Sequence, residues 1–145
     1  MACSLILRGE RRTSMNMPRA LGLTTCPSAS CSDGTHLIGI IGSDGRVQYL
    51  GRPTPIDVQF VSVADAGTLP ESRFRFAEAC ARERCGHWAG QVCSLVERIT
   101  EAVPPNVGGT VLPACGIRRS CVWYKQVGAR ACVACPAVVH SAASV

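Results

Sequence analysis

Cysteine is the residue type that most constrains what this chain can fold into. The 145 residues include 10 cysteines, and nine of them lie in local groups between Cys26 and Cys135. Aromatic residues make up only 5% of the chain, so ring burial contributes little to a core. We therefore expect the cysteines to hold much of the fold together. The three groups are Cys26-x4-Cys31, Cys80-x4-Cys85-x7-Cys93 and Cys115-x5-Cys121-x10-Cys132-x2-Cys135.

The cellular compartment decides whether such cysteines form disulfides or bind metals. No apolar stretch approaches the roughly 20 residues that a membrane helix needs. The short apolar run at residues 4–7 is followed at once by Arg8, which is not typical of a secretory signal. We therefore expect a cytoplasmic protein, whose reduced thiols suit metal binding or redox chemistry.

The positive charge of the chain does not indicate a nucleic-acid partner. The formal net charge is +5, and all the cationic residues except Lys125 are Arg. The arginines include pairs such as Arg118-Arg119 but no stripe interleaved with aromatic residues, so we do not expect nucleic-acid binding. A Gly-rich phosphate loop and a recognisable nucleophile, base and orienting group are also missing from the sequence. This pattern favours an electron-transfer or accessory protein over an independent enzyme.

Changes in composition divide the chain into three parts. Residues 1–24 are predicted to be a disordered basic extension, residues 25–137 a cysteine-rich metal- or cluster-binding domain, and residues 138–145 a flexible tail. The central part is predicted to be a small α+β domain with one β-hairpin and about three short helices. Its clearest element is the hairpin, because Asp44-Gly45 can form a tight turn between the strands predicted at 36–41 and 46–50.

Two helix signals precede the middle cysteine group. Thr54-Pro55-Ile56-Asp57 can cap a helix, although the β-branched residues 58–63 also suit a strand. Thr68-Leu69-Pro70-Glu71 has the pattern of a capping box, so we expect it to open a second helix. The residues expected on one face of that helix are Phe74, Ala77 and either Cys80 or Ala81.

Two further helices are expected in the second half of the chain. Residues 92–103 have the strongest helical period, and Pro104-Pro105 should end that helix. The last helix is expected at about 117–127, with Gly128 past its end. Its predicted core-facing residues are Ile117, Cys121 and Tyr124.

The last cysteine group is a complete set of ligands. Four thiolates are what a tetrahedral zinc ion or an iron–sulfur cluster requires. The middle group is one thiolate short, and either Cys26 or Cys31 could supply it across the hairpin. His36 and His87 are alternative ligands, because each is close to a cysteine in sequence. The predicted ligands are Cys115, Cys121, Cys132 and Cys135 in one site, and Cys80, Cys85 and Cys93 with Cys26 or Cys31 in the other.

The spacing of the ligands favours iron–sulfur over zinc. Zinc sites commonly use short Cys-x2-4-Cys turns, because each turn presents two thiolates to one ion. Only Cys132-x2-Cys135 has the shortest of these spacings, whereas the longer gaps suit a cluster whose irons lie apart. Pro136 directly after Cys135 is also typical of bacterial ferredoxin motifs. We predict one or two clusters of the [2Fe-2S] or [4Fe-4S] type, with zinc as the alternative cofactor.

One family resemblance rests on this last group. Cys121-x10-Cys132-x2-Cys135, preceded by Arg118-Arg119-Ser120 and followed by Pro136, resembles the C-terminal [2Fe-2S] motif of the ferric siderophore reductase family. That motif normally begins with two adjacent cysteines. Here Ser120 stands at the first of those positions, and Cys115 would replace it. The resemblance covers residues 115–136 alone, so it implies a cluster at these cysteines and does not extend to siderophore reduction.

The cysteine pattern therefore predicts a small iron–sulfur protein. It would act as an electron carrier or as a small redox subunit of a larger enzyme, with another redox protein as its partner. Arg118, Arg119, Trp123 and Tyr124 would tune or shield the C-terminal site. The alternative is a zinc-stabilised adaptor with no redox activity. A redox dithiol at Cys132-x2-Cys135 and plain structural cysteines are the remaining interpretations.

Overall fold

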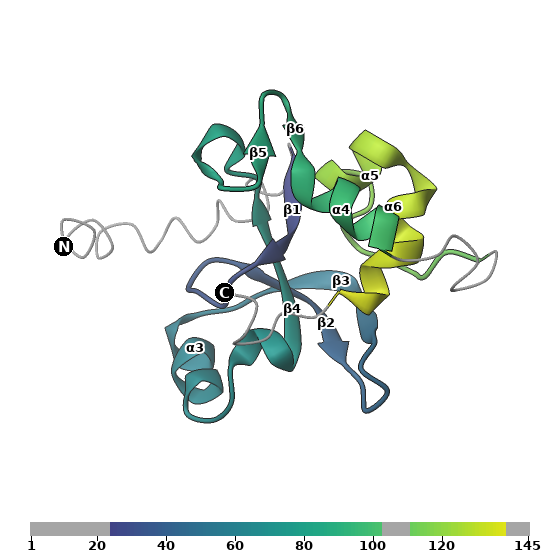
Figure 1. Cartoon of the computed structure of the whole chain (residues 1–145). Coiled ribbons are helices and arrows are strands. Elements are labelled where there is room, and N and C mark those ends of the chain that lie inside the picture. The colour runs from purple at the N-terminus through teal and green to yellow at the C-terminus, as the bar shows by residue number, and fades with distance from the viewer. Residues whose placement is uncertain (1–23, 103–110, 139–145) are drawn as a thin grey trace.

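The structure is a computed structural model that describes residues 24–102 and 111–138. Within these ranges the chain is a small α+β domain, as predicted, with two antiparallel sheets and four α-helices (Figure 1). The predicted N-terminal extension and C-terminal tail lie almost wholly outside the described residues. The strands are β1 (Thr25–Ala29), β2 (His36–Ile41), β3 (Val47–Pro55), β4 (Phe74–Ala79), β5 (Trp88–Ala89) and β6 (Val92–Cys93). The helices are α3 (Val58–Asp65), α4 (Ser94–Ala102), α5 (Val122–Val127) and α6 (Ala129–Ala134), and short 3-10 turns lie at Pro70–Ser72, Arg82–Arg84 and Cys135–Ala137.

The larger sheet has the strand order β1-β4-β2-β3, and β5 and β6 form a separate pair. Pairing of β2 with β3 confirms the predicted hairpin. Gly45 closes its turn with φ +81°, a left-handed conformation that favours glycine. β3 continues past the expected end at residue 50, because its second half pairs with the start of β2 after a register shift between Leu37 and Gly39.

The prediction of a helix that opens at Thr68-Leu69-Pro70-Glu71 is wrong. Only a 3-10 turn forms there, and strand β4 follows it. β4 lies between β1 and β2 and pairs with both, so its backbone groups find partners on two sides. The apolar residues of β4 lie on both of its faces, and the spacing of Phe74, Ala77 and Cys80 matched a helical period by coincidence.

The two faces of the larger sheet bury different clusters. On one face Phe74 packs edge-on against Phe60 of α3, with the ring centroids 5.5 Å apart. On the other face Ala77 belongs to a cluster with Val96 of α4 and Trp123 of α5. Figure 1 shows the same division, with α3 to one side of the sheet and α4, α5 and α6 gathered on the other. Alternate residues of β4 therefore pack against helices on opposite faces of the sheet.

Helix α3 resolves the ambiguity of residues 58–63 in favour of a helix. It begins after Asp57, whose side chain accepts a hydrogen bond from the Phe60 amide at 2.9 Å. The expected start at Thr54 lies within β3 instead. Because β3 pairs with β2 as far as Pro55, the helix can begin only once that pairing has ended.

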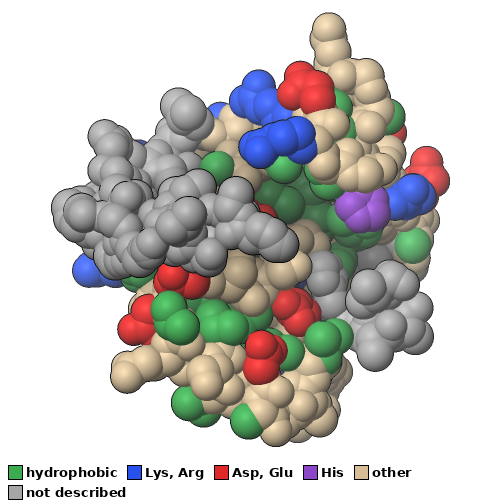
Figure 2. All heavy atoms as spheres, turned by 90° about the vertical axis from the view of Figure 1, so that its left-hand side faces the viewer, with side chains coloured by type: hydrophobic (Ala, Val, Ile, Leu, Met, Phe, Trp, Pro, Cys, Tyr) green, Lys and Arg blue, Asp and Glu red, His purple; other side chains and the backbone are tan. Residues whose placement is uncertain are grey.

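The molecular face on the left-hand side of Figure 1 carries different side chains near α3 than in its upper part. Figure 2 shows acidic and apolar side chains together over the lower part of this face, and Lys or Arg side chains on its upper part. On α3 itself, Val58 and Val63 are exposed by 64% and 76%. Among the described residues, no helix combines the length and apolar character needed to cross a membrane.

Helix α4 confirms the strongest helical period in the sequence. It starts later than predicted, because Val92 pairs with Ala89 in the short β5–β6 hairpin. Its predicted end at Pro104-Pro105 lies outside the described residues. The short hairpin follows Cys85 and includes Cys93, which lies directly before α4.

The last predicted helix begins five residues later than expected. Residues 116–120 form turns, and α5 starts at Val122. The Thr25 amide of β1 donates a hydrogen bond to the Ser120 carbonyl at 2.7 Å, and Thr25 forms a β-bridge with Cys121. This contact with the sheet holds Cys121 in an extended conformation, so the helix begins only after it. Gly128 ends α5 with φ +74°, as expected, and α6 follows it.

Candidate metal centre

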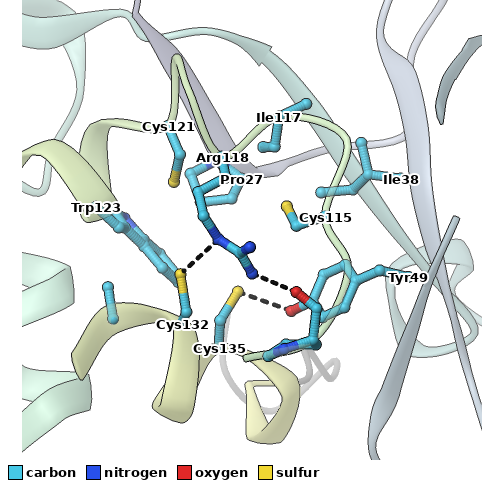
Figure 3. Close-up of a pocket in the computed structure, with 12 residues that line it drawn as sticks. Pro27, Ile38, Tyr49, Cys115, Ile117, Arg118, Cys121, Trp123, Cys132 and Cys135 are labelled. Atoms are coloured by element: carbon cyan, nitrogen blue, oxygen red, sulfur yellow. Dashed lines mark hydrogen bonds between the residues drawn. The ribbon is translucent and has the colours of Figure 1, made fainter. Parts of the chain in front are cut away.

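The four cysteines of the last group line one pocket, which we call the thiol pocket. Figure 3 shows their sulfur atoms directed toward a common space. Cys115 comes from the loop before α5, Cys121 directly precedes that helix, Cys132 lies in α6, and Cys135 begins the following 3-10 turn. Residues up to 20 positions apart in the sequence thus line the same pocket. Their role as ligands stays a prediction.

The walls of the thiol pocket are otherwise largely apolar. The cavity between these walls is small, with a volume of about 20 Å³. Trp123 is only 1% exposed and forms part of the wall, as the sequence analysis expected of a shielding residue. Arg119 and Tyr124 are exposed and do not line this pocket. Apolar walls restrict water near the sulfurs, which strengthens electrostatic interactions there.

Three side chains donate hydrogen bonds to sulfur atoms of the pocket. The Tyr49 hydroxyl donates to Cys135 Sγ at 2.8 Å, and Arg75 Nη2 donates to the same sulfur at 3.2 Å. Arg118 Nε donates to Cys132 Sγ at 3.3 Å (Figure 3). Hydrogen bonds of this kind favour a negatively charged sulfur. The donors come from β3, β4 and the loop before α5, so only the tertiary fold assembles them.

Arg75 is a buried cation on a central strand. It is 4% exposed, and its guanidinium lies 5.5 Å from the centre of the Trp123 ring. Its Nε donates to the Pro27 carbonyl at 2.6 Å, and its Nη1 donates to the carbonyls of Cys135 and Val138, each at 3.1 Å. Within the described ranges no carboxylate pairs with it. A buried cation needs compensating charge, and the sulfur it contacts is a source of that charge.

The pKa values of Arg75 and Tyr49 are both raised, which is consistent with their contacts to Cys135. Burial by itself lowers the pKa of Arg75, but an ionised Cys135 and the Tyr49 oxygen more than offset that effect, so the pKa is raised. Burial raises the pKa of Tyr49, and the charge of an ionised Cys135 raises it further. Tyr49 therefore stays protonated at neutral pH and remains a donor to the sulfur.

Two of the pocket thiols, Cys115 and Cys121, have raised pKa values and hold their protons more tightly than a free thiol. Burial raises the pKa of Cys121 to about 12, although the backbone amides of Tyr124 and Trp123 act in the opposite direction. Burial also raises the pKa of Cys115. A metal that binds here must displace protons from these thiols, so its affinity depends on pH.

The loop that carries Cys115 is held close to strand β3. A Cβ atom at Gly116 would lie 2.7 Å from Pro53 Cδ and 3.1 Å from the Gly51 carbonyl oxygen. Gly116→Ala is therefore expected to push the loop off β3 and to lower the free energy of unfolding by about 1–3 kcal/mol. Denaturant unfolding of the full chain measures this loss. Gly67→Ala, where a Cβ meets open space, is the control, and equal losses in both variants would contradict the close approach.

The structure distinguishes between the two cysteines proposed as the fourth ligand of the second site. The Cys31 amide donates to a carboxylate oxygen of Glu71, and Cys31 packs against the cluster on the α3 side of the sheet. Cys26 lies on β1 opposite Glu78 of β4, and the Cys80 amide at the end of β4 donates to the Thr24 carbonyl at the start of β1. Of the two, Cys26 is therefore the neighbour of the middle group.

The two histidines have other surroundings. His36 is buried at the start of β2, where burial lowers its pKa, and its Nδ1 has no hydrogen-bond partner in the described part of the chain. The Nδ1 atom of His87 lies 3.1 Å from Arg98 Nη2, on the exposed side of α4. Neither histidine lines the thiol pocket.

Sequence analysis missed Arg75 and Tyr49 as residues of the site. Each lies on a strand far from the last cysteine group in sequence, and no local motif connects them to it. The one available signal is an arginine between two phenylalanines in Phe74-Arg75-Phe76, which marks a charged residue within a buried strand. Arg118, in contrast, was expected beside the site and contacts Cys132.

The chemistry of these residues is the only guide to their function. Comparisons with protein-family models, curated proteins and solved structures find no match. Within residues 24–102 and 111–138, no three side chains of the His, Cys, Asp and Glu types converge closely enough to hold a single metal ion. The four pocket thiols thus surround a space and do not meet at one point. Four thiols, three donors to sulfur and one buried cation fit a thiolate-bound group that carries net negative charge.

Proposed function

We propose that the chain is an iron–sulfur protein that carries electrons, alone or as a small redox subunit of a larger enzyme. Cys115, Cys121, Cys132 and Cys135 would hold the cluster, which would supply one-electron chemistry when bound. The resemblance of residues 115–136 to a [2Fe-2S] motif supports this ligand set. Another redox protein would be the partner. The reducing cytoplasm would be a suitable compartment, because it keeps the thiols available as ligands.

The observation that carries this proposal is the arrangement of thiols around the buried Arg75. Four neutral thiols would leave its guanidinium without a compensating charge, whereas a four-thiolate centre carries net negative charge. A single zinc ion needs four sulfurs about 2.3 Å from one point. A cluster spreads its ligands over separate irons, and sulfurs that surround a space suit it better.

The residues around the pocket have separate tasks in this proposal. Tyr49, Arg75 and Arg118 donate hydrogen bonds to ligand sulfurs and so make reduction easier, because they stabilise added negative charge. Trp123 and the apolar walls keep water away from the centre. Cys115, Cys132 and Cys135 are only half-buried, so an electron partner would approach the centre where these residues meet the surface.

Metal analysis of anaerobically purified protein tests the proposal. The preparation is expected to be brown and to contain iron and acid-labile sulfide in near-stoichiometric amounts. Cys115→Ser and Cys132→Ser should each change the visible spectrum strongly, because each removes one thiolate from the cluster. Cys31→Ser is the matched control, since Cys31 lies on the other side of the sheet. A colourless preparation that holds only zinc would show that the protein is not an electron carrier.

A further inference from the structure

Outside the thiol pocket, backbone pairing makes Cys26 and Cys80 neighbours. In the β1–β4 pair, Cys26 stands opposite Glu78 and Thr25 opposite Ala79. The Cys80 amide then donates to the Thr24 carbonyl at 2.8 Å. Cys80 is therefore held at the end of β4 that lies beside Cys26.

The β5–β6 hairpin brings two more cysteines to this end of the sheet. The Trp88 amide donates to the Cys85 carbonyl at 3.1 Å, and Trp88 pairs directly with Cys93. Cys85 and Cys93 thus flank the same short hairpin. Cys93 belongs to the buried apolar cluster against which Cys80 and Trp88 also pack, so the hairpin and the end of β4 lie side by side.

Backbone amides donate to two of these sulfurs. The Ser28 amide donates to Cys26 Sγ and the His87 amide to Cys85 Sγ, each at 3.4 Å. In both cases the donor lies two residues after the cysteine. Repeated N–H to sulfur contacts of this kind favour the thiolate form, which is the form that binds metals.

Cys93 is the most firmly held member of the group. It is 8% exposed, and the Gln126 side chain binds its backbone on both sides. The Cys93 amide donates to Gln126 Oε1, and Gln126 Nε2 donates to the Cys93 carbonyl, both at 2.9 Å. Gln126 lies on α5, the helix that begins after Cys121 of the thiol pocket. The two cysteine groups are thereby fixed to one another.

We propose that Cys26, Cys80, Cys85 and Cys93 form a second four-thiolate site that binds its own thiophilic metal centre, either zinc or an iron–sulfur cluster. This inference goes beyond the proposed function, because it holds whichever metal occupies the thiol pocket. The four sulfurs do not converge on one point in the described residues, so the proposal requires them to close around the metal as it binds. Cys31 takes no part, since its amide donates to Glu71 and it packs against the cluster beside α3.

Arg75 connects the two sites. Its Nε donates to the carbonyl of Pro27, the neighbour of Cys26, and its Nη2 donates to Cys135 Sγ. One buried cation therefore contacts a sulfur of one cysteine group and the backbone beside Cys26 of the other.

Elemental analysis of the full chain tests the second site. Cys26→Ser is expected to remove the metal of that site, which is half of the total if both sites hold the same centre. Cys135→Ser should remove the other share, and the double variant should retain almost none. Cys31→Ser should match the wild type. A Cys26→Ser protein with the metal content of the wild type would overturn the second site.

A second measurement uses only the wild-type protein, so it does not depend on any variant folding. Alkylation followed by mass spectrometry should label Cys31 in the loaded protein and leave Cys26, Cys80, Cys85 and Cys93 unlabelled. After metal removal these four should become reactive. Labelling of Cys80 or Cys85 as fast as Cys31 in the loaded protein would overturn the proposal.

The outcomes separate this inference from the proposed function. Zinc in both sites would refute electron transfer but support the second site. A brown protein whose iron and total metal are unchanged in Cys26→Ser would support the cluster in the thiol pocket and refute the second site.

Discussion

Removal of the proposed metal centre from the full chain is expected to unfold most of the protein. Structural four-thiolate metal sites contribute on the order of 10 kcal/mol to folding. Small domains have total free energies of unfolding of about 5–15 kcal/mol, so loss of the metal contribution would remove most of that stability. The helices around the thiol pocket also depend on it, because α5 and α6 have six residues each and helices this short are not stable alone.

Circular dichroism melts with and without a strong chelator, under reducing conditions, measure this effect. The chelated protein should lose its cooperative transition, and added metal should restore it. Cys31→Ser should respond as the wild type does, because Cys31 is outside both proposed sites. An unchanged melt after metal removal has been verified would mean that the sheet and its two apolar clusters are sufficient for folding.

Arg75→Met is expected to lower the free energy of unfolding by about 3–5 kcal/mol. Methionine fills a similar volume but donates no hydrogen bond. The carbonyls of Pro27, Cys135 and Val138 would lose their contacts with the guanidinium, and the pocket would lose its buried positive charge. Each unsatisfied buried acceptor costs about 1–3 kcal/mol. Denaturant unfolding of the loaded protein gives the size of the change.

Arg118→Met is the matched control for this prediction. Arg118 also donates to a pocket sulfur, Cys132 Sγ, but it is only half-buried. Water can replace its contacts, so a loss of about 1 kcal/mol or less is expected. The reduction potential should fall in both variants, because each removes a donor to a ligand sulfur. Equal stability losses would show that burial of Arg75 is not what makes it important.

Local sequence was sufficient for the elements that depend on local chemistry. The Asp44-Gly45 turn and its hairpin follow from the backbone freedom of glycine, and α4 follows from a strong amphipathic period. The C-terminal cysteine group was recognised from spacing alone, and its four members line one pocket. In each case neighbouring residues carry the whole signal.

Elements that depend on distant partners were misread. β4 has an apolar period that also suits a helix, and pairing with β1 and β2 on both sides made it a strand. Helix α5 starts at Val122, later than predicted, because the Thr25 amide donates a hydrogen bond to the Ser120 carbonyl. Both errors have the same cause, since hydrogen bonds to a distant strand outweigh weak local preferences.

The sequence by itself determined the α+β class, the hairpin and a set of four thiols at one end of the chain. Only the tertiary structure decided that Cys26, and not Cys31, lies with the middle group, because the β1–β4 pairing brings Cys26 beside Cys80, whereas Cys31 packs against the cluster beside α3. It also brought Arg75 and Tyr49 to the thiol pocket from separate strands. Charge balance in a buried site depends on which residues meet in space, and sequence spacing carries no record of that.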